Sequence, residues 1–255
     1  MHPRGLLNPD ENASYATSAT HAPAPAAAPF VVFYWHVRWR APEPYDTKVL
    51  AHPNVHLVFE EPEPLVYGVD RGLFVRRIEG EGHVLGIKFT PGGFRSFAGG
   101  PVIDLADRRV PARHFFGAEI ADVNEAVLGS GDPAARAEAF LLPRLPAEPD
   151  PLAGEVAEMV GRITDDPSLT RVAQAARTLG VSTRTLQRLF AEYVGASPKW
   201  VLRRARLHEA AARADRGGTV DWAELAADLG YSDQSHLTRD FTATVGTSPA
   251  AYARA

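Results

Sequence analysis

Hydrophobic and polar residues alternate in short runs between residue 30 and about residue 94, and turn-forming residues separate these runs. An alternation with a period of two is typical of β-strands that have one buried face. The strands expected from it cover residues 30–40, 55–59, 65–67, 74–75 and 84–89. The Pro- and Gly-containing segments at 61–64 and 79–82 are interpreted as turns. Several short strands joined by such turns predict a small antiparallel β barrel or sandwich.

A helical pattern replaces the strands after the triplet Pro91-Gly92-Gly93. Hydrophobic residues spaced three or four apart predict helices over residues 118–128 and 134–142, which would form a helical tail on the β-rich domain. Four prolines then crowd into residues 143–151 and predict a linker. From residue 152 to the end, the chain is expected to be helical.

The fold class predicted from these patterns is α+β with two domains. The first 29 residues, which are rich in Ala, Pro, Ser and Thr, are predicted to be a disordered lead-in. The β-rich domain then covers residues 30–142, the linker 143–151, and an all-α domain 152–255. The length of 255 residues agrees with two domains, since one domain takes roughly 150 residues.

The helical part of the chain contains an internal repeat. Ala176, Leu179 and Gly180 recur 50 residues later, and seven further identities follow at an offset of 51. The first members of the seven pairs are Leu186, Arg188, Phe190, Val194, Gly195, Ser197 and Pro198, and the second are Leu237, Arg239, Phe241, Val245, Gly246, Ser248 and Pro249. So many identities in register indicate a true repeat with one residue gained in the second turn.

Each copy of the repeat has the pattern of a helix-turn-helix unit. In the first copy, a helix over residues 170–179 ends at Gly180, because the turn needs a positive φ that glycine adopts at low cost. Ser182 is placed to cap the following helix through its hydroxyl group. In the second copy, a helix over residues 223–229 ends in the same way at Gly230.

Between the two copies, Ser197 and Pro198 predict the start of a connecting helix, since proline is favoured in the first helical turn. This helix is expected to continue to about Arg216, and about 19 residues at 1.5 Å each give a length of about 28 Å. Successive major-groove faces of DNA lie about 34 Å apart. A helix of this length can therefore hold two recognition helices about one turn apart on one side of a duplex.

The charge of the chain indicates a nucleic-acid partner only when it is counted by segment. The net charge of −4 argues on its own against a nucleic-acid partner. Residues 1–150 hold 14 Lys and Arg against 19 Asp and Glu, whereas residues 151–255 hold 13 against 12. Within the second part, the window 171–207 holds eight basic residues and the single acid Glu192. This basic window agrees with DNA binding by the helical domain.

The repeated motifs resemble those of the AraC/XylS-type bacterial transcription regulators, whose DNA-binding region holds two helix-turn-helix units joined by a helix. The resemblance covers roughly residues 165–255 and includes the one-residue difference between the two turns. The residues that carry it are Ser182, Arg184, Leu186, Arg188, Phe190, Gly195, Ser197, Pro198, Arg206 and Ala210, then Ala226, Gly230, Tyr231, Ser232, Gln234, Leu237, Arg239, Phe241, Gly246, Ser248 and Pro249. The resemblance implies a sequence-specific transcriptional regulator that reads two adjacent major-groove segments.

The base-reading residues are expected on the outward faces of the two recognition helices. In the first unit these are Arg184, Gln187 and Arg188, which share one helical face and which the resemblance also assigns to base reading. Arg pairs with guanine and Gln with adenine in the major groove. The corresponding residues of the second unit are Gln234, Ser235, His236 and Arg239, with Asp240 expected to neutralise Arg239 in part. Contacts to phosphate are expected from Ser182, Thr183, Arg203 and Arg204, with intramolecular pairing as the alternative for the two arginines.

The role of the β-rich domain stays open at this point. The resemblance implies an effector-binding or dimerisation domain, and the alternative is a domain used only for dimerisation or docking. A different alternative is a cupin-like metal-dependent enzyme, supported by His52, His56 and Glu60 on one strand face. That face is expected to point outward, because Val55, Leu57 and Phe59 form the apolar side.

Other function classes are excluded by composition and motif. The chain has no Cys, which removes disulfides and cysteine nucleophiles. No apolar run is long enough to span a membrane, so a cytoplasmic protein without a membrane partner is expected. Catalytic residues, metal ligands and cofactors are not expected. The partners expected are double-stranded DNA and a small-molecule effector of unknown identity, with RNA polymerase and a second copy of the chain as further candidates.

Overall fold

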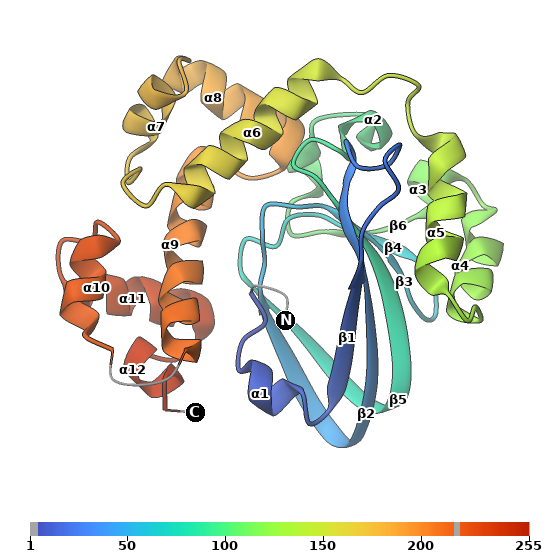
Figure 1. Cartoon of the computed structure of the whole chain (residues 1–255), viewed down its shortest axis with the longest axis horizontal. Coiled ribbons are helices and arrows are strands. Elements are labelled where there is room, and N and C mark those ends of the chain that lie inside the picture. Colours follow the sequence, from blue (N-terminus) through green and yellow to red (C-terminus); the bar gives the residue numbers. More distant parts are fainter. Residues whose placement is uncertain (1–4, 217–219, 255) are drawn as a thin grey trace.

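A computed structural model describes residues 5–216 and 220–254. The chain forms an N-terminal antiparallel sheet with helices along one side, followed by an all-helical part that lies beside the sheet (Figure 1). The prediction of a β-rich domain followed by a double helix-turn-helix is confirmed.

A six-stranded sheet with the strand order β1-β2-β5-β3-β4-β6 makes up the first domain, and all of its pairings are antiparallel. Its strands are β1 (Ala16–His21), β2 (Val31–Leu50), β3 (His56–Phe59), β4 (Leu65–Tyr67), β5 (Leu73–Phe89) and β6 (Arg109–Pro111). The long strands β2 and β5 form the centre of the sheet, and β3 pairs with β5 over Leu85–Lys88 only. The remaining length of β5 on that side is therefore an edge without a β3 partner.

The segment 79–82 lies inside β5, so its interpretation as a turn is wrong. The two glycines of this segment explain the error. Gly80 has a φ of 62° beside an irregularity in the pairing of β2 with β5, and a Cβ atom on Gly82 would lie 2.2 Å from the ring of Trp39. Glycine in a strand allows such a close approach of a large neighbouring side chain.

The lead-in predicted to be disordered is ordered over its described part, so that prediction is also wrong. α1 (Pro9–Asn12) is followed by β1, which pairs along the edge of β2 from Ala16 opposite Trp39 to His21 opposite Tyr34. The Ala- and Thr-rich composition carries no hydrophobic alternation of its own. Its order comes from backbone hydrogen bonds to an exposed neighbouring edge, which local composition does not reveal.

Short helices cover one end of the sheet and its side away from the all-helical part, where α4 and α5 are labelled on the right of Figure 1. They are α2 (Arg95–Ala98), the 3₁₀ turn η1 (Val102–Leu105), α3 (Arg113–Phe116), α4 (Ile120–Leu128), α5 (Pro133–Leu141) and the 3₁₀ turn η2 (Leu142–Arg144). The apolar stripes of α4 and α5 join the same hydrophobic cluster as the inner face of the sheet, with Ile120, Val127 and Phe140 buried. The two predicted helices of the tail are thus present.

The helical part contains two helix-turn-helix units and the helices that flank them. Its elements are α6 (Pro151–Asp165), α7 (Val172–Thr178), α8 (Thr183–Leu189), the π-helical turn η3 (Phe190–Val194), α9 (Pro198–Asp215), α10 (Trp222–Asp228), α11 (Gln234–Val245) and α12 (Pro249–Tyr252). The two units have separate hydrophobic clusters, one around Phe190 and one around Phe241. No helix in the described part of the chain is both long and apolar enough to cross a membrane.

Candidate nucleic-acid interface

The two units repeat one local geometry, as the sequence repeat predicts. Gly180 and Gly230 end the first helix of each unit with φ values of 72° and 69°. In both turns the amide that follows this glycine donates back into the helix, from Val181 to the carbonyl of Ala176 at 3.0 Å and from Tyr231 to that of Ala226 at 2.8 Å. The same chain reversal therefore places α8 after α7 and α11 after α10.

Each recognition helix has a side-chain cap at the residue just before it. The Ser182 hydroxyl accepts from the Thr185 amide at 3.0 Å, as expected. In the second unit the cap is Asp233, whose carboxylate accepts from the His236 amide at 2.8 Å. The residue gained in the second turn thus moves the cap one position along the chain, and an Asp just before a helix is the signal that would have identified it.

The recognition helices bury one face each and leave the candidate base-reading residues outside. Leu186 and Phe190 on the first unit, and Leu237 and Phe241 on the second, are fully buried. The opposite faces carry the exposed side chains Arg184, Gln187, Arg188, Gln234, Ser235, His236 and Arg239. The structure therefore places each group of predicted base-reading residues on one exposed helix face. Their contacts to bases remain a prediction.

The basic window divides into exposed and inward-facing residues. Arg171, Arg177 and Lys199 are exposed in addition to the arginines of α8. Arg203 instead pairs with Asp240 of α11 at 2.6 Å, and Arg206 lies over the ring of Tyr231 at 4.4 Å. These two side chains join α9 to the second unit. Asp240 thus forms its ion pair with Arg203, whereas Arg239 donates to the carbonyl of Ser235.

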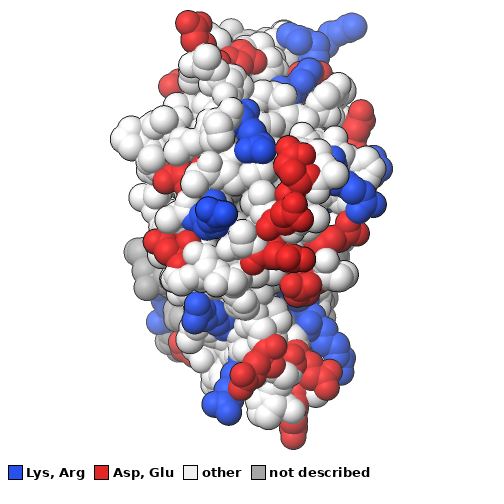
Figure 2. Space-filling model, turned by 90° about the vertical axis from the view of Figure 1, so that its right-hand side faces the viewer, with Lys and Arg blue, Asp and Glu red and all other residues white. Residues whose placement is uncertain are grey.

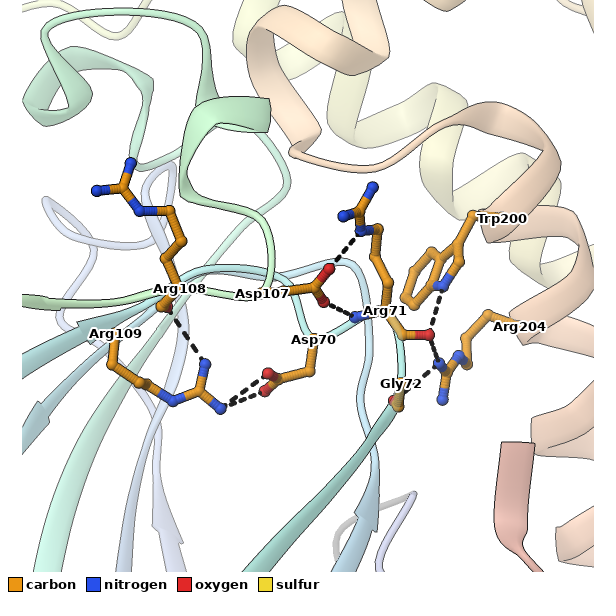
Figure 3. A network of polar contacts seen from close by, with 8 residues as sticks. All are labelled: Asp70, Arg71, Gly72, Asp107, Arg108, Arg109, Trp200 and Arg204. Carbon is orange, nitrogen blue, oxygen red and sulfur yellow. Dashed lines mark hydrogen bonds and ion pairs between the residues drawn. The ribbon is translucent and has the colours of Figure 1, made fainter. Parts of the chain in front are cut away.

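Arg204 is not available to a phosphate, so its predicted role is wrong for this fold. Only 3% of it is exposed, and its guanidinium donates to the main-chain carbonyls of Arg71 at 2.8 Å and Gly72 at 3.1 Å (Figure 3). The intramolecular alternative therefore holds for this arginine. Arg203 also pairs within the chain but keeps 40% of its side chain exposed, so its contact with phosphate stays a prediction. Ser182 and Thr183, at the start of α8, remain candidates for phosphate contact.

The N-terminal domain contacts both helix-turn-helix units. Near the first unit, Arg95 pairs with Glu192 at 2.6 Å, and Val69 belongs to the hydrophobic cluster of that unit. Near the second unit, Leu7 and Leu50 join its hydrophobic cluster. The relative position of the two units is thus supported by α9 and also by the N-terminal domain.

The outer side of the N-terminal domain has a mixed charge pattern. Asp and Glu side chains form a column there, and Lys and Arg are scattered around it (Figure 2). The exposed acids of this side include Glu119, Asp122 and Glu125 around α4. A surface with this column repels phosphate, so DNA is expected on the helical domain.

The three candidate metal ligands do not come together. His52 stacks on His208 of α9 at 4.0 Å, while His56 accepts a hydrogen bond from the Trp35 indole at 3.0 Å. Glu60 is buried and accepts hydrogen bonds from Tyr67 and Arg76. Within residues 5–216 and 220–254, no three His, Asp or Glu side chains are grouped as a metal site would require.

The buried surroundings of His56 give the protein a pH-dependent stability. Desolvation, with Lys88 as the next cause, lowers the pKa of His56 from 6.5 to about 3. The unfolded chain therefore binds this proton first as the pH falls, so the stability contribution is complete above about pH 6.5 and declines toward pH 3. Urea unfolding should show a loss of about 1 kcal/mol per pH unit between pH 6 and pH 4 from this group, below the full 1.4 because the unfolded imidazole is only partly protonated near pH 6.

The His56→Gln variant isolates this effect from that of the carboxylates. Its free energy of unfolding should depend less steeply on pH over the same interval, and the exposed His114→Gln variant is the matched control. Equal slopes for wild type and His56→Gln would contradict the assignment.

Comparison with known proteins finds one family model in the N-terminal part of the chain and another in the C-terminal part. A family model described as a helix-turn-helix domain matches residues 175–255, and one described as a domain of unknown function (DUF6597) matches residues 19–111. No curated protein matches.

Solved structures with a similar arrangement of elements are distant in sequence. ToxT from Vibrio cholerae O395 aligns with a TM-score of 0.42 at 10% identity, over 94% of this chain and 98% of that chain. Wild-type ToxT from Vibrio cholerae strain SCE256 with a bound unsaturated fatty acid gives 0.37 at 10% identity, over 94% and 95%. The transcriptional regulator CdpR from Pseudomonas aeruginosa gives 0.34 at 22% identity, over 70% of this chain and 47% of that chain.

Proposed function

We propose that the chain is an AraC-type DNA-binding transcription regulator with a β-rich N-terminal domain, and that its two units read two adjacent major-groove segments together. The observation that supports this most is the duplicated turn geometry at the two ends of α9. That helix has 18 residues and is therefore about 27 Å long. This is close to the spacing of about 34 Å between major-groove faces on one side of DNA.

In this proposal the outward residues of α8 and α11 read bases. Arg184, Gln187 and Arg188 supply most of the specificity, since the first unit has two exposed arginines on its recognition face and the second has one. Ser182 and Thr183 contact phosphate at the start of α8. The protein acts in the cytoplasm and has no catalytic activity, and RNA polymerase and a second copy of the chain are further proposed partners.

The N-terminal domain is proposed to make DNA binding responsive to an effector. The support is its contact with both units, through Val69 on one side and Leu7 and Leu50 on the other. A change in this domain can thus alter how the two units are positioned. The alternative is a domain that only dimerises or docks, and thermal-shift measurements against a panel of metabolites distinguish the two. A stabilising ligand supports the sensor, and the absence of any response favours docking.

Selection of bound sequences from random DNA tests the double reading. Two short conserved elements, with centres about 10 bp apart, are expected from units one helical turn apart. A single short element would contradict simultaneous use of both units. Binding should also weaken with increasing salt, because phosphate contacts release counterions.

A further inference from the structure

An open cavity of about 540 Å³ lies in the N-terminal domain, beside the edge of β5 that has no β3 partner. Its walls come from the first half of β5, the end of β3, β4 and β6. Pockets that bind small molecules commonly measure about 300–1,000 Å³. The size therefore suits a small organic ligand.

The charges around this cavity favour an anion. Arg76, Arg77 and Arg109 line it, and the acids among its walls are Glu60 and Asp70. Glu60 is already paired with Arg76 at 2.5 Å, and Asp70 with Arg109 at 2.8 Å. Arg77 remains largely exposed, and its long ion pair of 4.0 Å is with Asp46, which does not line the cavity. Among the lining residues, three arginines thus face two acids, and a single negative group can balance the difference.

Aromatic rings beside the arginines add an apolar wall. The guanidinium of Arg109 lies 4.0 Å from the ring centre of Tyr67 and 5.5 Å from that of Phe74. Val75, next to Phe74 on β5, has 48% of its surface exposed. A ligand with a flat or apolar body beside its negative group would cover these surfaces.

One wall of the cavity continues into the contact with the DNA-binding domain. Asp70, held by Arg109, begins a turn whose next residue, Arg71, is held by Asp107 through its amide at 2.7 Å and its Nε at 2.6 Å (Figure 3). The other side of this turn presents the carbonyls of Arg71 and Gly72 to α9. The ring nitrogen of Trp200 also donates to the Arg71 carbonyl, at 3.1 Å.

Arg204 depends strongly on the position of that turn. It is buried without a carboxylate partner in the described part of the chain, and its Nη1 has no hydrogen-bond partner there. Desolvation lowers the pKa of this guanidinium to about 10. A buried charged donor that loses its acceptors costs more free energy than a neutral one. Displacement of the 70–72 turn therefore destabilises the contact between α9 and the N-terminal domain.

From these contacts we propose that the cavity binds a small organic anion with an apolar body. The anion draws Arg109 away from Asp70 and thereby weakens the hydrogen bonds between α9 and the 70–72 turn. This proposal rests on the effector response proposed above and assigns it a site, a ligand class and a route. The effect reaches α9 through the ion pair of Arg109 with Asp70, then through the 70–72 turn and the carbonyl groups of Arg71 and Gly72.

Binding is tested with 8-anilinonaphthalene-1-sulfonate, an organic anion whose fluorescence rises in apolar surroundings. Wild type should bind one equivalent saturably, and Arg109→Gln and Arg77→Gln should each bind about tenfold more weakly or worse, because a charged hydrogen bond is lost. Asp70→Asn should bind more tightly than wild type, since Arg109 is freed. The matched control is Arg108→Gln, whose exposed side chain bonds the Asp104 carbonyl outside the cavity.

The use of two variants lets the fluorescence experiment test the cavity even if one variant fails to fold. Arg77 is exposed and bonds no part of the turn, so Arg77→Gln is informative even if Arg109→Gln fails to fold. Equal binding by wild type, Arg77→Gln and any folded Arg109→Gln would overturn the assignment of the cavity.

The route to α9 is tested by amide hydrogen exchange over residues 199–208. The anion should speed exchange there about fivefold or more, and Asp70→Asn should do so without the anion. Unchanged exchange in both cases would overturn the route.

On a DNA site obtained by random selection, the anion should also change wild-type affinity about fivefold or more. The fluorescence and exchange experiments contain no DNA, so their failure would leave the DNA-reading proposal standing, and a failed selection would leave their result intact.

Discussion

Arg184→Ala and Arg188→Ala should each weaken binding to the selected DNA site by about 1–3 kcal/mol, or about 5- to 150-fold. Both side chains are exposed on the outward face of α8, one turn apart, while Leu186 between them is fully buried. An arginine in this position can donate two hydrogen bonds to the edge of one guanine. Its loss should therefore relax preference at one base position in addition to lowering affinity.

Fluorescence anisotropy with the selected site and with sites changed at single positions measures both effects. The matched control is Arg177→Ala, which removes the same charge from an exposed position on α7. This control should lower affinity for all sequences alike, with a smaller salt dependence. If the two α8 variants also lost affinity equally on every sequence, their side chains would be phosphate contacts and the assignment of base reading would be wrong.

The internal repeat made the helical domain predictable in detail. Matching glycines, caps and buried aromatic residues recur in both units, and each has one local physical reason: a positive φ, an amide to satisfy or a core position to fill. Gly195 and Gly246 show this well, since both adopt φ values of 86° at the end of their recognition elements. Local rules apply wherever neighbours in sequence decide the conformation.

Contacts between distant segments could not be predicted in this way. The order of β1 depends on the free edge of β2, and the burial of Arg204 depends on a turn more than 130 residues away. In the sequence, Arg203 and Arg204 are equivalent members of a basic run. In the structure one pairs with Asp240 and the other donates to carbonyls of the first domain. Charge patterning alone therefore overstates the basic surface that is free for DNA.

The same contacts support the proposal that the N-terminal domain influences DNA reading. It touches the first unit around η3 and the second unit through Leu50, while α9 joins the two units between these places. Among the residues that the structure describes, the units share no hydrophobic cluster. Their relative position is thus set by one helix and by a neighbouring domain, which is an arrangement that a shift in that domain can change.

Because their hydrophobic clusters are separate, we expect that each unit can be destabilised by a mutation without destabilising the other. Phe241→Ala should lower the free energy of unfolding by about 3–5 kcal/mol, because a fully buried aromatic side chain leaves a cavity when truncated. The loss falls on the cluster that contains Leu237, Val245 and Tyr252, while the cluster around Phe190 is unchanged. Urea unfolding measures the loss, with the exposed Thr242→Ala on the same helix as control.

DNA footprinting then separates the two units functionally. Phe241→Ala should lose protection over the element read by α11 and keep it over the element read by α8, with weaker overall affinity. Phe190→Ala, also fully buried, should give the complementary footprint. Loss of both elements together in each variant would mean that the units fold and bind as one body. In that case α9 and the N-terminal domain would transmit damage between clusters that share no residue, and independent reading by the two units would be wrong.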